Sequence, residues 1–323
     1  MPVDRAAEAA VIADVFAGTL ARERAARLIG IARGWRPDVI LHDEADYGAA
    51  VAADVLGLPR AQMLVLLPGG TVDRARLAAS LARTRASFGL PAAHPPAAIT
   101  LEPAPPGFRD PSDPLPGDVR RIRPAVLEVA PARPDPDTAA TLAWLARQPE
   151  RPTVWFTLGT VFHQESGDLF GRVLAGLGRV EASVVVTVGR EIDPAELGPP
   201  PANVRVERYV PQQFLLPRCD LLVCHAGSGS VLGALASGVP MLLLPMGADQ
   251  PANADQCAAL GVATVLDPLT TTPAEVTAEA RVLLTDPRFR LAAAPWRDVC
   301  AALPSAKYAV GWIRTLAAHS SSS

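Results

Sequence analysis

The sequence predicts an α/β protein with two parallel-sheet halves, and two observations carry this prediction. Short apolar runs of strand length alternate with helical patterns over residues 38–88 and again from residue 153 onward. The runs Leu221–Cys224 and Met241–Leu244 contain no polar side chain, as expected for strands buried on both faces of a parallel sheet. The chain has 323 residues, 49% of them apolar, which is enough for two domains with their own cores.

Composition excludes several classes of protein. The net charge is −3 and no run of Lys or Arg occurs, so nucleic acid is not an expected partner. No apolar run approaches about 20 residues and the N-terminus lacks a signal peptide, so we expect a cytoplasmic protein without a membrane span. Cys219, Cys224, Cys257 and Cys300 fit neither a disulfide nor a zinc pair and are expected to be buried thiols. Lys307 is the only lysine, which indicates a GC-rich genome, such as that of an actinobacterium.

The first half is expected to be a partial domain over residues 1–125. Its predicted elements are a helix over 6–33, a strand over 38–42, a helix over 47–56, a strand over 60–67 and a helix over 71–88. Residues 91–137 are dense in proline and are predicted to be loop and linker, with the linker ending at about residue 137.

The second half, residues 138–323, repeats the α/β alternation. Its predicted strands cover 153–158, 184–188, 204–206, 221–224, 241–244 and 263–266. Its predicted helices cover 139–147, 167–178, 231–237, 251–260, 273–284, 287–300 and 305–317. Asp137 or Thr138 is expected to cap the first of these helices, and Thr272 and Glu275 form a capping box for the fifth.

The turn after strand 221–224 has the composition of a phosphate cradle. It reads Gly227-Ser228-Gly229-Ser230 and leads into a helix. A helix N-terminus presents unpaired N–H groups and a partial positive charge, glycines allow close approach, and serines add hydroxyl donors. His225 ends the strand and is expected to donate a hydrogen bond to a diphosphate oxygen.

The sequence of this turn also suggests other interpretations. Gly227, Gly229 and Gly233 approximate a dinucleotide fingerprint with Asp249 as the ribose ligand, which keeps a nicotinamide oxidoreductase as an alternative. Against it, Asp249 does not directly follow the strand. A serine-hydrolase elbow is excluded because Ala226 and Ser230 replace its glycines. A turn that only packs helix on strand is the remaining alternative.

An ordered series of residues in this region resembles the donor-binding signature of family 1 glycosyltransferases with the GT-B fold. The matching residues are Pro211-Gln212, Leu215-Leu216, Asp220, His225, Gly227, Ser230, Gly238-Val239-Pro240, Pro245, Asp249-Gln250 and Asn253-Ala254. The similarity is closest to bacterial enzymes that glycosylate natural products such as macrolides and aromatic polyketides. A UDP-GlcNAc 2-epimerase of the same fold is a further alternative, which the Asp249-Gln250 pair disfavours.

The resemblance implies two Rossmann-like domains that face a cleft, an acceptor domain and a donor domain, with the last helix crossing back onto the first. It implies inverting transfer from a UDP- or dTDP-sugar to a hydroxyl group of a small molecule, without a metal. The implied donor-site residues are Thr160, Ser228, Gly229 and Ser230 for phosphate, Tyr209 for base stacking, the Val210 backbone for the base edge, Gln212 for ribose, and Asp249 and Gln250 for the sugar. Gly233 stands where UDP-preferring relatives carry Glu, so the choice between UDP and dTDP stays open.

The acceptor half carries one implied catalytic residue. The segment from Pro37 to Asp43 resembles the family strand whose final Asp orients a histidine base, which points to Asp43. The alternative is that Asp43 caps the helix starting at Tyr47. No histidine precedes His42, so we expect roughly 70 residues, two or three βα units, to be absent from this domain and transfer to be weak or nil.

Two acidic clusters are not expected to bind metal. His42, Asp43, Glu44 and Asp46 follow one another on a turn and cannot all converge on one ion. The Asp135-Pro136-Asp137 string matches the metal-binding motif of GT-A transferases, but it lies in a proline-rich linker without a preceding strand.

Overall fold

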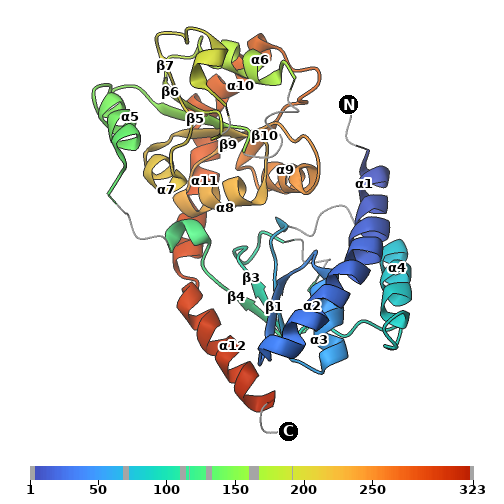
Figure 1. Ribbon diagram of the computed structural model, residues 1–323. Coiled ribbons are helices and arrows are strands. Elements are labelled where there is room, and N and C mark those ends of the chain that lie inside the picture. The colour runs from blue at the N-terminus through green and yellow to red at the C-terminus, as the bar shows by residue number, and fades with distance from the viewer. Residues whose placement is uncertain are drawn as a thin grey trace. The chain divides into compact units, whose positions relative to one another are not determined.

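The computed structural model describes residues 4–67, 73–109, 114–115, 117–128, 133–159, 167–190 and 192–320 (Figure 1). The chain divides into two compact units. One comprises Val3–Arg123 with Leu303–Ser323, and the other contains Pro124–Ala302. Each has a parallel sheet, so the predicted α/β class with two parallel-sheet halves is confirmed.

The first unit is built on a four-stranded sheet of order β1-β2-β3-β4. Its strands are β1 Ile40–Asp43, β2 Arg60–Met63, β3 Ile99–Glu102 and β4 Val119–Arg121. Its helices are α1 Arg5–Val11, η1 Ile12–Leu20, α2 Ala21–Trp35, α3 Tyr47–Leu56, α4 Arg74–Ala86 and α12 Ala306–Ser320. Within the described residues β1 pairs on one side only, so its other edge is open.

The predicted helix over 6–33 is continuous but contains a π-helical segment, η1, that the sequence did not indicate. A π turn leaves a backbone carbonyl without its usual helical donor. The hydroxyl of Thr84 on α4 donates to the Ala17 carbonyl at 2.8 Å. Gly18 lets the helices approach, because a Cβ there would lie 3.2 Å from the Ser80 hydroxyl.

The prediction of loop and linker over 91–137 is wrong in part, because β3 and β4 lie within it. All four residues of β3 are buried, and β4 is a three-residue edge strand. The prolines of this segment lie outside the two strands, where they do not interrupt the ladder hydrogen bonds. The predicted cap of the next helix is also wrong: α5, Pro136–Ala146, is capped by Asp135, whose carboxylate accepts the Thr138 backbone N–H at 2.9 Å. Pro136 occupies the first helical turn, a position that proline favours.

The C-terminal helix α12 packs on the first unit's sheet. Ala309, Trp312, Ile313 and Leu316 contact a small cluster made of Ala61, Ile99, Leu101 and Ile122. The Arg120 guanidinium on β4 lies over the Trp312 ring, 5.1 Å from its centroid. The backbone N–H of Arg123 donates to the Pro304 carbonyl at 2.8 Å. The last helix therefore completes the core of a sheet formed more than 180 residues earlier.

The second unit contains a six-stranded parallel sheet of order β10-β9-β8-β5-β6-β7. Its strands are β5 Thr153–Thr157, β6 Ser183–Thr187, β7 Val204–Glu207, β8 Leu221–Cys224, β9 Met241–Leu243 and β10 Ala263–Val265. Its helices are η3 Ala125–Leu127, α5, α6 Leu169–Leu177, η4 Pro194–Leu197, α7 Gln212–Leu215, η5 Leu216–Arg218, α8 Ser228–Ser237, α9 Gln250–Ala259, α10 Pro273–Thr285 and α11 Pro287–Ala301. The predicted capping box of α10 is present.

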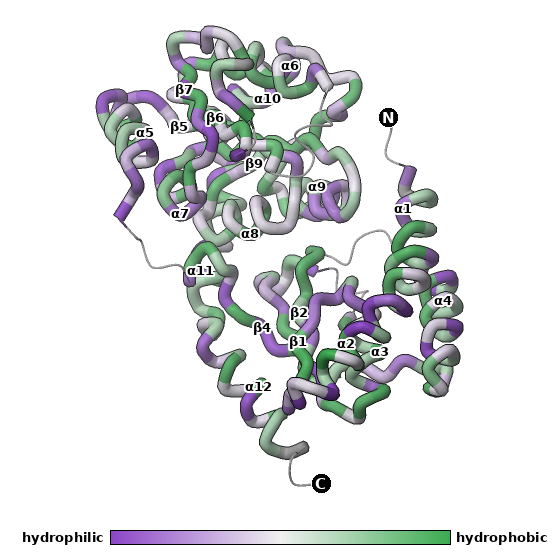
Figure 2. The backbone as a smooth tube through the Cα atoms, viewed as in Figure 1, coloured by the Kyte–Doolittle hydropathy of each residue, from purple (hydrophilic) through white to green (hydrophobic). Residues whose placement is uncertain are grey.

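The central strands of this sheet are buried on both faces, which explains their unbroken apolar sequences. Val154, Phe156 and Val223 join α6 and α10 in one core cluster. The intervening Trp155 and Leu222, which point to the opposite face, are buried as well. Figure 2 shows hydrophobic residues along these strands.

The four cysteines are free thiols, as predicted, and three of them are buried. Burial raises the pKa of Cys224 to about 12, which makes it an unreactive thiol at neutral pH. Among the described residues, no helix is long and apolar enough to cross a membrane.

Candidate functional site

The turn between β8 and α8 forms the centre of the candidate site. Helix α8 begins at Ser228, three residues before the predicted start, so Gly229 and Ser230 lie in its first turn. Gly227 is the N-cap residue and provides no side chain to cap the helix. Among the described residues no side chain caps this helix end, although the Ser230 N–H donates to the Gly227 carbonyl at 3.0 Å. The positive end of the helix dipole at the carboxyl edge of the sheet favours an anion there.

The His225 imidazole lies between two glycines, one from each of two neighbouring strand ends. A Cβ added at Gly227 would lie 2.4 Å from His225 Nε2, and one added at Gly159, after β5, would lie 2.6 Å from Cε1. Its Nδ1 is buried without a hydrogen-bond partner among the described residues. Burial lowers the pKa of His225 to about 4, and the nearby Asp249 carboxylate only partly opposes this. At neutral pH the ring is uncharged and can donate one N–H to a ligand.

A buried hydrogen-bond network fixes the cradle from the next strand along. The Asp249 carboxylate, at the start of α9, accepts the Ser228 hydroxyl at 2.5 Å and the Asn253 amide at 2.8 Å through the same oxygen. The Asn253 amide also donates to the Ala226 carbonyl at 2.8 Å. Asn253 appeared in the sequence only as part of a family pattern, with no role attached. Asp249, which was expected to hold a sugar, thus also binds the cradle.

Gln250 and Gln212 have defined positions in the structure. The Gln250 side-chain carbonyl accepts the Met246 backbone N–H at 2.7 Å, and the residue is buried. Gln212, the first residue of α7, lies against α8: a Cβ added at Gly233 would stand 2.8 Å from Gln212 Oε1. The Gln212 amide and the Leu216 side chain together fill the space above Gly233, where relatives that prefer UDP are expected to carry a carboxylate.

Tyr209 and Val210 follow β7 at the same edge of the sheet. Tyr209 is 45% exposed, whereas Val210 is buried and contributes only backbone to any ligand. The Arg190 guanidinium, which follows β6, lies over the Tyr209 ring at 4.4 Å from its centroid. The sequence prediction did not identify Arg190. Thr160, the remaining predicted phosphate ligand, lies outside the described residues.

Asp43 lies at the carboxyl end of β1 in the first unit. It is exposed, and its side chain accepts the Ala45 backbone N–H at 2.8 Å. The alternative prediction that Asp43 caps the next helix is wrong, because Asp46 caps α3 and pairs with Arg24 at 2.6 Å. Asp43 lines a cavity of about 400 Å³ together with apolar side chains that include Phe16.

The other members of the acidic turn each have a separate contact. Glu44 accepts the backbone N–H groups of Val65 and Leu66 at 2.7 and 2.6 Å, and burial raises the pKa of its carboxyl. His42 contacts the Asp43 carbonyl through Nδ1 at 2.7 Å, while its Nε2 is buried without a partner among the described residues. Over the described part of the chain, no three His, Cys, Asp or Glu side chains gather as a metal site.

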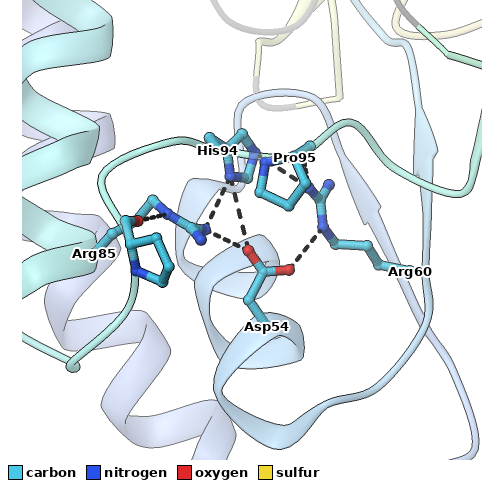
Figure 3. Close-up of polar contacts among 6 residues, drawn as sticks. Asp54, Arg60, Arg85, His94 and Pro95 are labelled. Atoms are coloured by element: carbon cyan, nitrogen blue, oxygen red, sulfur yellow. Dashed lines mark hydrogen bonds and ion pairs between the residues drawn. The ribbon is translucent and has the colours of Figure 1, made fainter.

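A buried charge cluster, which the sequence did not predict, holds the first unit together (Figure 3). Asp54 on α3 lies between two guanidinium groups, pairing with Arg60 at 3.3 Å and with Arg85. These guanidinium groups also donate to the backbone carbonyls of Pro95 and Pro91 and contact the two ring nitrogens of His94. Burial and the Arg60 charge lower the pKa of His94 to about 4, so two arginines share one carboxylate with a neutral imidazole.

Comparison with known proteins finds chains that are similar to this one in sequence. Residues 171–316 match the family described as the erythromycin biosynthesis protein CIII-like C-terminal domain. The chain is 29% identical over 312 residues to the 3-alpha-mycarosylerythronolide B desosaminyl transferase of Saccharopolyspora erythraea, a match that covers 90% of this chain and 71% of the relative. It is 31% identical over 266 residues to the tylactone mycaminosyltransferase of Streptomyces fradiae, covering 75% of this chain and 56% of the relative.

The fold is similar to that of a solved structure with a bound nucleotide. The crystal structure of glycosyltransferase VinC in complex with dTDP superposes with a TM-score of 0.72 at 29% identity. The match covers 95% of this chain and 80% of that one. The similarity to VinC thus spans nearly the whole of this chain.

Proposed function

We propose that the chain is a GT-B natural-product glycosyltransferase, which transfers a hexose or deoxyhexose from a dTDP- or UDP-sugar to a hydroxyl group of a small-molecule natural product, with inversion. The observation that carries the proposal is the neutral His225 beside the uncapped N-terminus of α8. These groups offer hydrogen-bond donors and a helix dipole to a diphosphate. No observation favours the epimerase or the oxidoreductase.

The donor half supplies electrostatic stabilisation of the leaving group. As the bond between the anomeric carbon and the phosphate oxygen breaks, negative charge grows on the diphosphate. We propose that N–H donors of the first turn of α8, the Ser230 hydroxyl and the His225 N–H receive this charge. Because these donors require no reorganisation, we propose that departure of the diphosphate needs no metal ion. We propose that Asp249 and Gln250 bind the sugar through the donor and acceptor groups that the buried network does not use.

We propose that dTDP is preferred over UDP. A ribose has two hydroxyl groups and favours a carboxylate that accepts from both, whereas the deoxyribose of dTDP has one. Gly233 supplies no carboxylate, and the Gln212 amide occupies the space beside it. An amide can accept from the single hydroxyl of deoxyribose without leaving a buried charge unpaired.

The acceptor half is proposed to bind an apolar small molecule in the cavity beside Asp43. Asp43 is proposed as the residue that orients the general base. Among the described residues, no imidazole donates to the Asp43 carboxylate, which accepts the Ala45 backbone N–H. The predicted low rate of transfer and the cytoplasmic location stay predictions.

Calorimetric titration of the chain with dTDP, UDP and NADP⁺ tests the proposal. We expect dTDP to bind more tightly than UDP, with no binding of NADP⁺. Binding of NADP⁺ alone would overturn the proposal. His225→Ala should weaken dTDP binding by roughly 10- to 150-fold, the effect of losing a hydrogen bond to a charged group. Incubation with dTDP-sugars and macrolide or polyketide aglycones, followed by mass spectrometry, tests the transfer itself.

A further inference from the structure

The ends of strands β6 and β7 remain paired beyond the strands themselves. The backbone N–H of Val188 donates to the Glu207 carbonyl at 3.0 Å, and that of Gly189 donates to the Arg208 carbonyl at 2.9 Å. Gly189 has a φ of +92°, a conformation that favours glycine. These contacts fix the backbone that carries Arg190 beside the backbone that carries Tyr209.

The Arg190 guanidinium covers one face of the Tyr209 ring. Its central carbon lies 4.4 Å from the ring centroid, within the range of a strong cation–π contact. The Tyr209 side chain nevertheless keeps 45% exposure. A ring with one face covered and this much exposure presents its other face to solvent.

The distance between the cradle and the Arg190–Tyr209 pair agrees with the length of a nucleoside diphosphate. Strand order places β5 and β6 between β8, which carries the cradle, and β7, which precedes Tyr209. Three interstrand steps correspond to roughly 14 Å. A diphosphate bound at His225 therefore directs its nucleoside along the carboxyl edge of the sheet toward Tyr209, past Gln212 on α7.

We infer that Arg190 is a positioning residue for nucleotide binding: its guanidinium supports the Tyr209 ring from behind, and the pyrimidine base stacks on the open face. The inference rests on the proposed function, because it requires a nucleoside diphosphate in the cradle. By holding the ring in one orientation before the ligand arrives, Arg190 reduces the conformational entropy that binding would otherwise cost.

A base that bound on the same face of Tyr209 as Arg190 would reverse the expected effect of removing Arg190 on dTDP affinity. If the base occupied the face on which Arg190 now lies, the guanidinium would have to leave first. Removing Arg190 would then leave dTDP affinity unchanged or increase it. The sign of the change in affinity therefore distinguishes support from competition.

A double-mutant cycle measured by calorimetry with dTDP tests the inference, using the full chain as wild type, R190A, Y209A and R190A/Y209A. We expect R190A to weaken binding by roughly two- to fivefold, and to cause no further loss once Tyr209 is absent. The control is R297A, which removes another exposed arginine of the same unit, paired with its neighbour Asp298, and should leave affinity unchanged. Thermal unfolding should give the same midpoint for R190A and the wild type.

The outcomes separate the inference from the proposed function. Wild-type binding of dTDP with unchanged or tighter binding by R190A overturns the inference alone. An equal loss caused by R190A with and without Tyr209 also overturns it, because Arg190 would then act on the ligand directly. Failure of the wild type to bind dTDP overturns both the proposed function and the inference.

Discussion

Adding one methyl group at Gly227 should displace His225 without straining the backbone. Gly227 has φ −63° and ψ 145°, which any residue adopts readily. The new Cβ would lie 2.4 Å from His225 Nε2 and 3.0 Å from Cε1, distances that two such atoms cannot keep. The Gly159 backbone also lies close to the ring, since a Cβ added there would stand 2.6 Å from His225 Cε1. Gly227→Ala therefore removes the imidazole from the cradle.

The expected magnitude follows from the bond that is lost. A hydrogen bond to a charged group contributes about 1.5–3 kcal/mol, so dTDP affinity should fall by roughly 10- to 150-fold, as for His225→Ala. Because both changes remove the same contact, the double variant should bind no worse than either single one. Calorimetry with dTDP on the three variants measures this.

Gly229→Ala is the matched control two residues away. A Cβ there meets nothing within 4 Å, and the residue lies inside the helix, where alanine stabilises by about 0.5–1 kcal/mol relative to glycine. Urea unfolding should show this variant to be at least as stable as the wild type, so a methyl group in the turn is not harmful in itself. Wild-type affinity of Gly227→Ala for dTDP would refute the reasoning, as would a further loss of affinity when it is combined with His225→Ala.

Three further predictions concern charges. Asp54→Ala leaves two buried arginines without their carboxylate and should destabilise the chain by about 3–5 kcal/mol in urea unfolding, and a loss below 1 kcal/mol would contradict the role of the cluster. Because the pKa values of His94 and His225 lie near 4 in the folded chain, below the unfolded value of about 6.5, their contribution to stability is complete above pH 6.5 and is lost as the pH falls through 4. His94→Gln should flatten that dependence in unfolding curves taken between pH 7 and 4. Asp249→Ala should weaken dTDP binding roughly tenfold by releasing the cradle hydroxyl, whereas unchanged affinity would show that the network does not organise the site.

Much of the second unit could be predicted because each of its signals is local. An unbroken apolar run such as Leu221–Cys224 indicates a strand buried on both faces, and a Gly/Ser turn followed by a helical pattern indicates the start of a helix. Gly238 ends α8 with a φ of +68°, which is the conformation its glycine indicated. These features depend on residues that are adjacent in sequence, so a single sequence contains them.

The first unit was harder to predict because its signals are weak or masked. Strands β3 and β4 are short and lie among prolines, and β4 carries two arginines at a sheet edge. The burial of β3 involves α12, which lies about 200 residues later and has no local relation to it. The Asp54 cluster likewise joins residues from α3, β2 and α4, and each of its members reads as an ordinary surface charge in the sequence.

In the proposed donor site, too, the local features could be predicted from the sequence and the long-range contacts could not. The sequence indicates that the Ser228 turn binds an anion, but it does not indicate that the Ser228 hydroxyl is held by Asp249 or that Asn253 supports the Ala226 carbonyl. Ala226 has a φ of +65°, a strained conformation for a residue with a side chain. The Asn253 hydrogen bond therefore stabilises a backbone shape that the turn would not keep alone. It follows that the cradle is formed jointly by the turns after β8 and β9, and substitutions after β9 should change phosphate binding even where they contact no phosphate.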